Sequence, residues 1–165
     1  MNGELRKLAL KRLIGKRKVS ELEKWRRHSL ATGVIAKTIA DALVSRSVNL
    51  DAALCEAGAL LHDIGRERTG GMLHGWRGYQ ILRKERHFLR CARFCITHWL
   101  KGRSEEEILK QGDISENLLK KILKEGDFSV LLLEDIVVCV ADSMARDDVL
   151  VDIKSRYDDA RRRYG

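Results

Sequence analysis

Apolar side chains recur along most of the chain at helical spacing, in segments separated by turn signals. A leucine-rich stripe over residues 4–14 predicts a short amphipathic helix that ends at Gly15. Ser20 and Glu23 form a capping-box pattern, and the apolar positions that follow predict a helix reaching about residue 44. The first quarter of the chain is therefore expected to consist of two helices.

The most hydrophobic segment covers residues 52–61, for which either Asn49 or Asp51 can serve as the N-cap. It is apolar nearly all round, so the pattern predicts a helix at the centre of the fold. It leads into residues 62–65, where Gly65 is typical of a helix C-terminus.

The pattern over the rest of the chain predicts further helices, some of them apolar and others polar. Ser104 and Glu107 form a second capping-box pattern. The polar middle of the chain is expected at the periphery, and the C-terminal tail is expected to be a solvated, charged helix. The predicted segments are residues 72–84, 88–100, 104–111, 115–124, the strongly apolar 131–144 and the tail 147–163.

Composition narrows the fold class. The 165 residues include no proline, so glycine is the only strong breaker, which favours helices joined by short loops. A hydrophobic content of 44% excludes a disordered chain, and no stretch reaches the roughly 18 apolar residues of a membrane span. The N-terminus lacks the apolar region of a secretion signal. We therefore expect one all-α domain in the cytoplasm.

The positive charge is concentrated at one end of the chain. Residues 1–27 carry 10 Lys or Arg against 3 Asp or Glu, whereas the other 138 residues carry 22 against 21. Two interpretations stay open: a basic arm that docks on RNA or another polyanion, and an amphipathic helix packed on the domain.

The four cysteines fit free thiols in a reducing compartment. No CxxC pair is present, and Cys91 and Cys95 share one helix face. Core packing is the favoured interpretation of this pair, with a redox or metal role as the alternative.

Metal-competent side chains interrupt the apolar segments. A carboxylate at such places is costly unless it is paired or bound to a metal. Neighbouring residues are about 100° apart around a helix, so His62 and Asp63 can hold one ion only at a cleft near the helix end. The candidate ligands are His28, His62, Asp63, His74, His98 and Asp142.

The order of these residues resembles the HD superfamily of metal-dependent phosphohydrolases, and His62-Asp63-Ile64-Gly65 is similar to its HDIG subgroup signature. The resemblance covers about residues 25–146, and it is greatest to small stand-alone HDIG proteins of archaeal type. It implies an HD-type helical bundle over residues 20–146, flanked by a basic segment at 1–19 and a charged helix at 147–165.

The resemblance also implies the ligand set. The superfamily pattern places a divalent metal (Fe, Mn, Ni, Co, Zn or Mg) on His28, His62, Asp63 and Asp142. Relatives with further histidines often hold a second ion, for which His74 and His98 would serve with Asp63 bridging. Trp99 stands where other two-metal members have another histidine. In the one-metal alternative, His74 and His98 contact phosphate or donate a proton.

The implied reaction is hydrolysis of a phosphoester or phosphoanhydride, in a small phosphorylated substrate such as a nucleotide, by metal-activated water. Asp63, Arg66 and Arg146 are the expected catalytic residues, with the two arginines holding phosphate or, alternatively, pairing with nearby acids. The rival functions are a metal-stabilised RNA-binding module and an oxygen-using di-iron enzyme. Arg68, Arg77 and Lys101 are less favoured phosphate contacts, and His87 is expected to be exposed.

Overall fold

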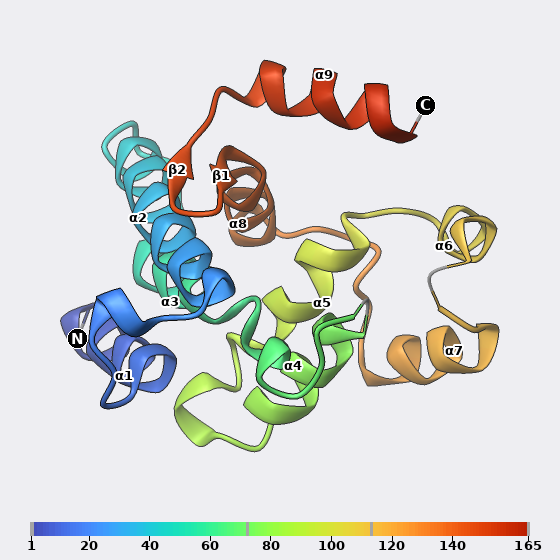
Figure 1. Cartoon of the computed structure of the whole chain (residues 1–165), viewed down its shortest axis with the longest axis horizontal. Helices are drawn as coiled ribbons and strands as arrows, with labels where there is room; N and C mark the ends of the chain where they lie inside the picture. The colour runs from blue at the N-terminus through green and yellow to red at the C-terminus, as the bar shows by residue number, and fades with distance from the viewer. Residues whose placement is uncertain (1, 72, 113, 165) are drawn as a thin grey trace.

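Helices form nearly all of the regular structure in the computed structural model, which describes residues 2–71, 73–112 and 114–164 (Figure 1). The all-α class predicted from the sequence is confirmed. The α-helices are α1 (Asn2–Ile14), α2 (Lys24–Val44), α3 (Ala52–Leu61), α4 (His74–Leu82), α5 (Ala92–Leu100), α6 (Glu105–Gln111), α7 (Glu116–Glu125), α8 (Leu133–Met144) and α9 (Ile153–Tyr164). The 3-10 helices are η1 (Val19–Glu21), η2 (Ile64–Glu67) and η3 (Arg86–Phe88).

Helix α3 lies at the centre of the main core, as its pattern predicts. All of its residues after Ala52 are buried, and it packs against α1, α2, α5 and α8. Gly58 permits the approach of α5, because a Cβ there would lie 2.2 Å from Cδ2 of Phe94. The helix therefore holds its C-terminal end, and the polar pair beyond it, at a fixed place among four other helices.

Two of the predicted helix caps are present. Asp51 caps α3 by accepting a hydrogen bond from the Leu54 amide at 3.0 Å, which decides between Asn49 and Asp51. The Ser104 and Glu107 capping box opens α6. Capping residues of this kind satisfy amide groups that the first turn leaves without a helical partner.

The predicted capping box at Ser20 and Glu23 is wrong. Ser20 lies inside η1, and α2 begins only at Lys24, with Glu23 as its N-cap residue. The backbone of Leu22 is extended, which allows its side chain to be buried and separates the two helices. Burial of this one apolar side chain overrides the local capping signal.

The basic N-terminal segment is a packed helix. Ala9 and Leu13 of α1 are fully buried in the main core. Arg6 pairs with Glu56 at 2.7 Å, and Arg12 pairs with Glu67 at 3.0 Å. The packed-helix interpretation therefore describes this segment better than a detached arm does.

Arg26 joins this segment to the region around the metal-competent pair. Its side chain is nearly fully buried, and it donates hydrogen bonds to Glu23, Glu67 and the carbonyl oxygen of Leu13. Burial by itself would raise the pKa of Glu67, but Arg12 and Arg26 outweigh it, and the pKa lies below its ordinary value. The ionised Glu67 thus balances the charge of two arginines.

Glu67→Gln should lower the free energy of unfolding by about 1–3 kcal/mol at neutral pH, because buried Arg26 loses part of its counter-charge. The pKa of Glu67 is lowered in the folded state, so its contribution is present above the ordinary glutamate pKa and disappears as the pH falls through the lowered value. Chemical denaturation at neutral and acidic pH measures this difference. Equal stabilities at neutral pH would contradict it.

The C-terminal region differs from the predicted continuous helix. Strands β1 (Ala145–Arg146) and β2 (Val149–Leu150) form an antiparallel hairpin, with Arg146 opposite Val149. Asp147 turns the chain with a φ of 58°, a conformation that aspartate tolerates better than most residues. The short apolar run after two aspartates therefore forms a strand, and α9 starts only at Ile153.

Helices α6 and α7, from the middle of the chain, lie at one side of the main bundle (Figure 1). Helices α6 and α7 pack on the end of α5 through a second apolar cluster that includes Trp99, Ile108 and Ile122.

Helix α4 begins at His74, close to its predicted start, while residue 72 lies outside the described residues. Helix α5 begins at Ala92, later than predicted, because the 3-10 helix η3 precedes it.

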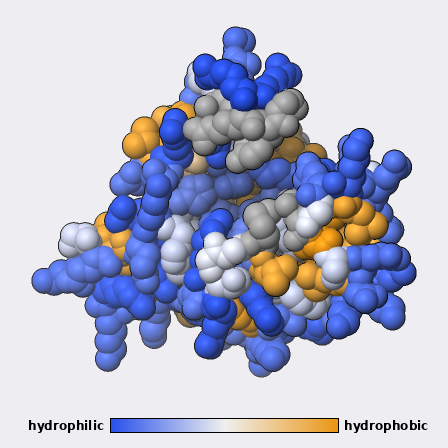
Figure 2. Space-filling view, turned by 45° about the vertical axis from the view of Figure 1, so that its right-hand side comes forward, coloured by the Kyte–Doolittle hydropathy of each residue, from blue (hydrophilic) through white to orange (hydrophobic). Residues whose placement is uncertain are grey.

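One face of the molecule is mostly hydrophilic. On the face shown in Figure 2, apolar residues form small separate patches among charged and polar ones. None of the helices within the described ranges is long and apolar enough to cross a membrane.

Candidate metal centre

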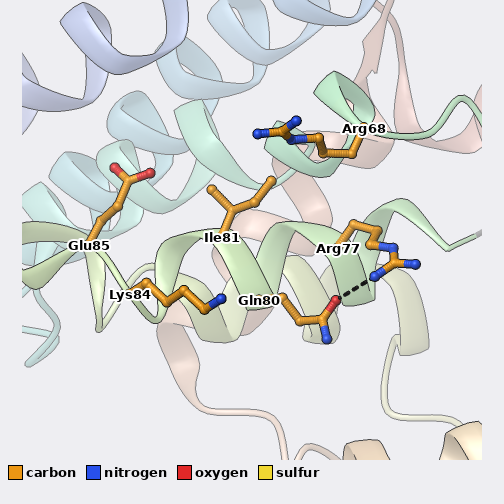
Figure 3. A pocket seen from close by; sticks show the side chains of 6 residues that line it. All are labelled: Arg68, Arg77, Gln80, Ile81, Lys84 and Glu85. Atoms are coloured by element: carbon orange, nitrogen blue, oxygen red, sulfur yellow. Dashed lines mark hydrogen bonds between the residues drawn. The ribbon is translucent and has the colours of Figure 1, made fainter.

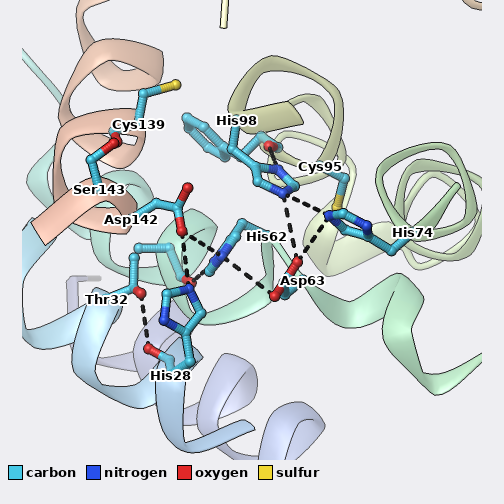
Figure 4. A network of polar contacts seen from close by, with 12 residues as sticks. His28, Thr32, His62, Asp63, His74, Cys95, His98, Cys139, Asp142 and Ser143 are labelled. Atoms are coloured by element: carbon cyan, nitrogen blue, oxygen red, sulfur yellow. Dashed lines mark hydrogen bonds and ion pairs between the residues drawn. The ribbon is translucent and has the colours of Figure 1, made fainter. Parts of the chain in front are cut away.

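The structure brings all six predicted ligands into one cluster (Figure 4). Each comes from a helix or the end of a helix, and together they draw on six helical segments. His28 lies on α2, His62 caps α3, Asp63 begins η2, His74 begins α4, His98 lies on α5 and Asp142 lies on α8. The fold thereby places His28 in hydrogen-bond contact with Asp142, although the two residues are 114 positions apart in the sequence.

The cluster consists of two groups. In the first, the Nε2 atoms of His28 and His62 lie 3.0 and 3.6 Å from Oδ1 of Asp142. In the second, the Nε2 atoms of His74 and His98 lie 3.2 and 3.6 Å from Oδ1 of Asp63. We call these the Asp142 group and the Asp63 group.

Asp63 connects the two groups through its two oxygen atoms. Oδ1 faces His74 and His98, whereas Oδ2 lies 3.9 Å from Nε2 of His62. A carboxylate placed in this way can serve ions on both sides, which is the position expected of a bridging ligand.

Three histidines are oriented by backbone carbonyl groups. The Nδ1 atoms of His62, His74 and His98 lie 2.6, 3.1 and 2.8 Å from the carbonyl oxygens of Ala59, Gly71 and Phe94. Nδ1 donates in each case, which leaves the lone pair of Nε2 directed into the cluster. Metal-binding histidines are held in this way, because the second nitrogen fixes both the tautomer and the ring orientation.

Two buried atoms of the cluster have unmet hydrogen-bonding capacity. His62 Nε2 and Asp63 Oδ1 form no hydrogen bond with any described residue. Buried polar atoms are nearly always satisfied, so such a pair requires an explanation. A divalent cation bound by imidazole nitrogen and carboxylate oxygen supplies one, and the donor set fits that ion.

The charge states also suit metal binding. Burial would raise the pKa values of Asp63 and Asp142, but neighbouring histidines lower them far below the ordinary range, so both are ionised at neutral pH. Burial and repulsion by His98 lower the pKa of His74 to about 4, which leaves its imidazole neutral. Two ionised carboxylates, Asp63 buried and Asp142 partly buried, thus lie in one cluster with the neutral imidazole of His74, the form of histidine that binds a metal.

Gly65 explains how Asp63 and His74 meet. A Cβ at this position would lie 1.9 Å from the carbonyl oxygen of His74 and 2.5 Å from the amide nitrogen of Gly78. Helix α4 therefore rests directly on Gly65, two residues after Asp63. The sequence pattern predicts a helix end at this glycine, but α3 already ends at Leu61, and the close contact is what requires a glycine.

A cavity of about 860 Å³ opens above the cluster. Arg66, Lys101 and Arg146, three of the candidate phosphate contacts, line it. Arg66 also donates a 2.6 Å hydrogen bond from Nε to Oδ2 of Asp63. Sequence reasoning missed further lining residues, among them Trp25 and Arg156, because neither belongs to a ligand pattern.

Arg68 and Arg77 do not line the metal cavity. They border a separate groove beside α4, where Arg77 donates a hydrogen bond to Gln80 and Lys84 lies just beyond the end of the helix (Figure 3). The hypothesis that these two arginines contact phosphate at the metal centre is therefore wrong. His87 is exposed in η3, as expected.

Cys91 and Cys95 are fully buried core residues. Burial raises the pKa of Cys91 to about 12 and that of Cys95 well above its ordinary value, so both thiols stay protonated at neutral pH. Reactive or metal-binding cysteines need the thiolate form. Core packing, the favoured interpretation of this pair, is therefore borne out.

The domain is all-helical, with a His-Asp pair at the end of its central helix and further side chains on the flanking helices that could bind a metal ion. Residues 25–147 match the HD domain family, and the chain belongs to that family. The resemblance inferred from the ligand order is thus confirmed at the level of the HD superfamily.

The chain is similar to three curated archaeal proteins. It is 36% identical over 85 residues to an uncharacterized protein of Methanocaldococcus jannaschii, covering 52% of this chain and 50% of that protein. It is 29% and 31% identical to tRNA (cytidine(56)-2'-O)-methyltransferases of Thermoplasma volcanium and Picrophilus torridus. Those matches cover 73% and 66% of this chain but 32% and 29% of the relatives, so the chain spans half or less of each protein. No solved structure matches the chain.

Proposed function

We propose that this protein is a metal-dependent phosphohydrolase that cleaves a phosphoester or phosphoanhydride bond of a nucleotide. The observation that carries the proposal is the pair of ligand groups joined by Asp63 at the floor of a large cavity. Membership of the HD family supports the reaction class. The signature at residues 62–65 favours the HDIG subgroup.

The residues of the Asp142 group, together with Asp63, would hold one divalent ion. The Asp63 group would hold a second. When bound, such a pair of ions activates a water molecule and polarises the oxygen atoms of the phosphate. The carbonyl groups that orient His62, His74 and His98 keep the Nε2 atoms in place before any ion binds, so little rearrangement is needed.

Arg66 has two roles in this proposal. Its Nε–H group fixes the orientation of the Asp63 carboxylate, and its remaining N–H groups, which form no hydrogen bond with a described residue, would bind a substrate phosphate at the cavity wall. Arg146 is exposed on β1 and lines the same cavity. Both guanidinium groups would neutralise negative charge on phosphate groups of the substrate.

A nucleotide substrate is supported by the cavity and by the relatives. A volume of about 860 Å³ exceeds the space that a single phosphate needs. Two of the relatives are named as tRNA methyltransferases, so similar sequences occur in proteins that act on RNA. The rival hypothesis of an RNA-binding module with little turnover is less favoured, because Arg6 and Arg12 of the basic segment, and Arg26 on α2, are engaged within the protein.

Metal analysis tests the two-ion arrangement. Wild-type protein should bind about two divalent ions per chain, and His98→Ala should bind about one, because it removes a ligand from the Asp63 group alone. His87→Ala is the control, since this histidine is exposed and outside the cluster. One ion in both wild type and His98→Ala would contradict the second site.

A panel of phosphoesters tests the reaction. Nucleoside monophosphates, nucleoside triphosphates, dinucleoside polyphosphates and cyclic nucleotides should be incubated with metal-loaded protein. We expect multiple turnovers on at least one of them. No turnover on any substrate with Mn²⁺, Fe²⁺ or Co²⁺ would contradict the proposed function.

A further inference from the structure

The cationic side chains that line the metal cavity are unequally paired. Lys24 pairs with Asp147 at 3.0 Å, Arg66 with Asp63 at 2.6 Å and Lys101 with Asp142 at 3.5 Å. The fourth acidic lining residue, Glu23, pairs with Arg26. Every carboxylate of the lining thus has a cation.

Arg146 and Arg156 differ from the other cations of the cavity because they lack such acidic partners among the described residues. Neither forms an ion pair with any side chain that the structure describes, although both line the cavity. Two guanidinium groups at one cavity, with the neighbouring carboxylates already engaged, form a site for an added anion. Guanidinium groups bind phosphate oxygens through paired N–H donors.

Arg156 is held towards the cavity by the start of α9. Asp152 accepts hydrogen bonds from both the amide and the hydroxyl of Ser155, which fixes the first turn. Arg156 is half-buried, whereas Lys154 and Tyr157 are exposed. Helix α9 begins beyond residue 147, where the family match ends, so this cation is an addition to the HD core.

Trp25 supplies an aromatic surface in the same cavity. Its side chain is half-buried, and the guanidinium carbon of Arg26 lies 4.2 Å from its ring centroid. Because Arg26 is itself fixed by Glu23 and Glu67, the indole is held in one place. A positioned indole is a suitable platform for stacking a nucleobase.

We propose that Arg146 and Arg156 bind a second phosphate group of the substrate, beyond the one that reacts at the metal centre, while Trp25 stacks on its base. This inference rests on the proposed function and narrows the substrate class to nucleotides with two separately placed phosphates. Both a free nucleoside bisphosphate and the phosphorylated end of an RNA strand have this chemistry, since the next linkage of the strand supplies the second phosphate.

Equilibrium binding to the full chain in the presence of a chelator tests the subsite without hydrolysis. Adenosine 3′,5′-bisphosphate should bind about ten- to a hundredfold more tightly than adenosine 5′-monophosphate, the range expected for one or two charge-assisted hydrogen bonds. Arg156→Gln should reduce this preference to about threefold or less. Arg162→Gln removes the same charge from an exposed position on α9 and should leave the preference unchanged.

Trp25→Leu should weaken the binding of both ligands by about tenfold and preserve their ratio, because the base is common to both. Circular dichroism checks that each variant is folded. Equal binding of the two ligands to the wild type, or an unchanged preference in Arg156→Gln, would overturn the subsite.

Two comparisons complete the test. If an oligoribonucleotide with a terminal phosphate binds more tightly than the free bisphosphate, the source of the second phosphate is an RNA end. If the free bisphosphate binds more tightly, the source is a free nucleotide. A bisphosphate preference without any hydrolysis on metal loading would contradict the proposed function alone. Hydrolysis without that preference would contradict the subsite alone.

Discussion

Asp63→Asn should reduce phosphoester hydrolysis on the order of 10³-fold and lower the bound metal from about two ions per chain to one or fewer. The substitution keeps the size of the side chain but removes the charge that both ligand groups share. The Nε2 atoms of His74 and His98 lie within 3.6 Å of one Asp63 oxygen, and that of His62 lies 3.9 Å from the other. Steady-state kinetics and metal analysis of one preparation measure both effects.

Asp148→Asn is the matched control. Asp148 is exposed next to the hairpin turn and contacts Arg27 at 3.6 Å, away from the ligand groups. The hydrolytic activity of Asp148→Asn should remain within about twofold of wild type, since exposed ion pairs contribute little to stability. If Asp63→Asn and Asp148→Asn hydrolysed substrate equally well, Asp63 would have no part in the reaction.

Gly65→Ala should lower the free energy of unfolding by about 3 kcal/mol, at the upper end for overpacking, and displace α4. The new Cβ would meet the backbone of His74 and Gly78, which cannot move aside like a flexible side chain. A loss of this size corresponds to a decrease in Tm of roughly 6–12 °C for a chain of this length. Because His74 begins α4, binding of the second ion should weaken as well.

Gly70→Ala is the control for stability, because nothing lies within 4 Å of a Cβ at that position. Its free energy of unfolding should stay within about 0.5 kcal/mol of wild type. Thermal unfolding at one fixed metal concentration compares the two variants, since bound metal itself stabilises the fold. Equal Tm values for Gly65→Ala and wild type would show that α4 does not rest on Gly65.

Most helix positions and the candidate ligands could be predicted from the sequence, because each depends on local pattern or on residue chemistry. The apolar run of α3, interrupted only by Glu56, requires burial, and polar residues at its end require partners. Those two requirements together place the His-Asp pair at the centre of the molecule. The ligand order then supplies the resemblance that the family match confirms.

Features that depend on contacts between distant parts of the chain could not be predicted from the sequence. The start of α2 is decided by burial of Leu22 against the core, which no capping pattern contains. Arg156 reaches the cavity only because a hairpin, with a left-handed residue at Asp147, turns the chain back before α9. Arg68 and Arg77 are close in sequence to Arg66 and His74 yet face a different groove, since rotation around a helical segment separates neighbouring side chains.

Metal reconstitution tests the central claim most directly. Protein stripped with a chelator should hydrolyse no phosphoester, and titration with a divalent ion should restore activity until about two ions are bound per chain. Activity that persists in fully stripped protein, or that no divalent ion restores although the protein is folded, would contradict a metal-dependent phosphohydrolase.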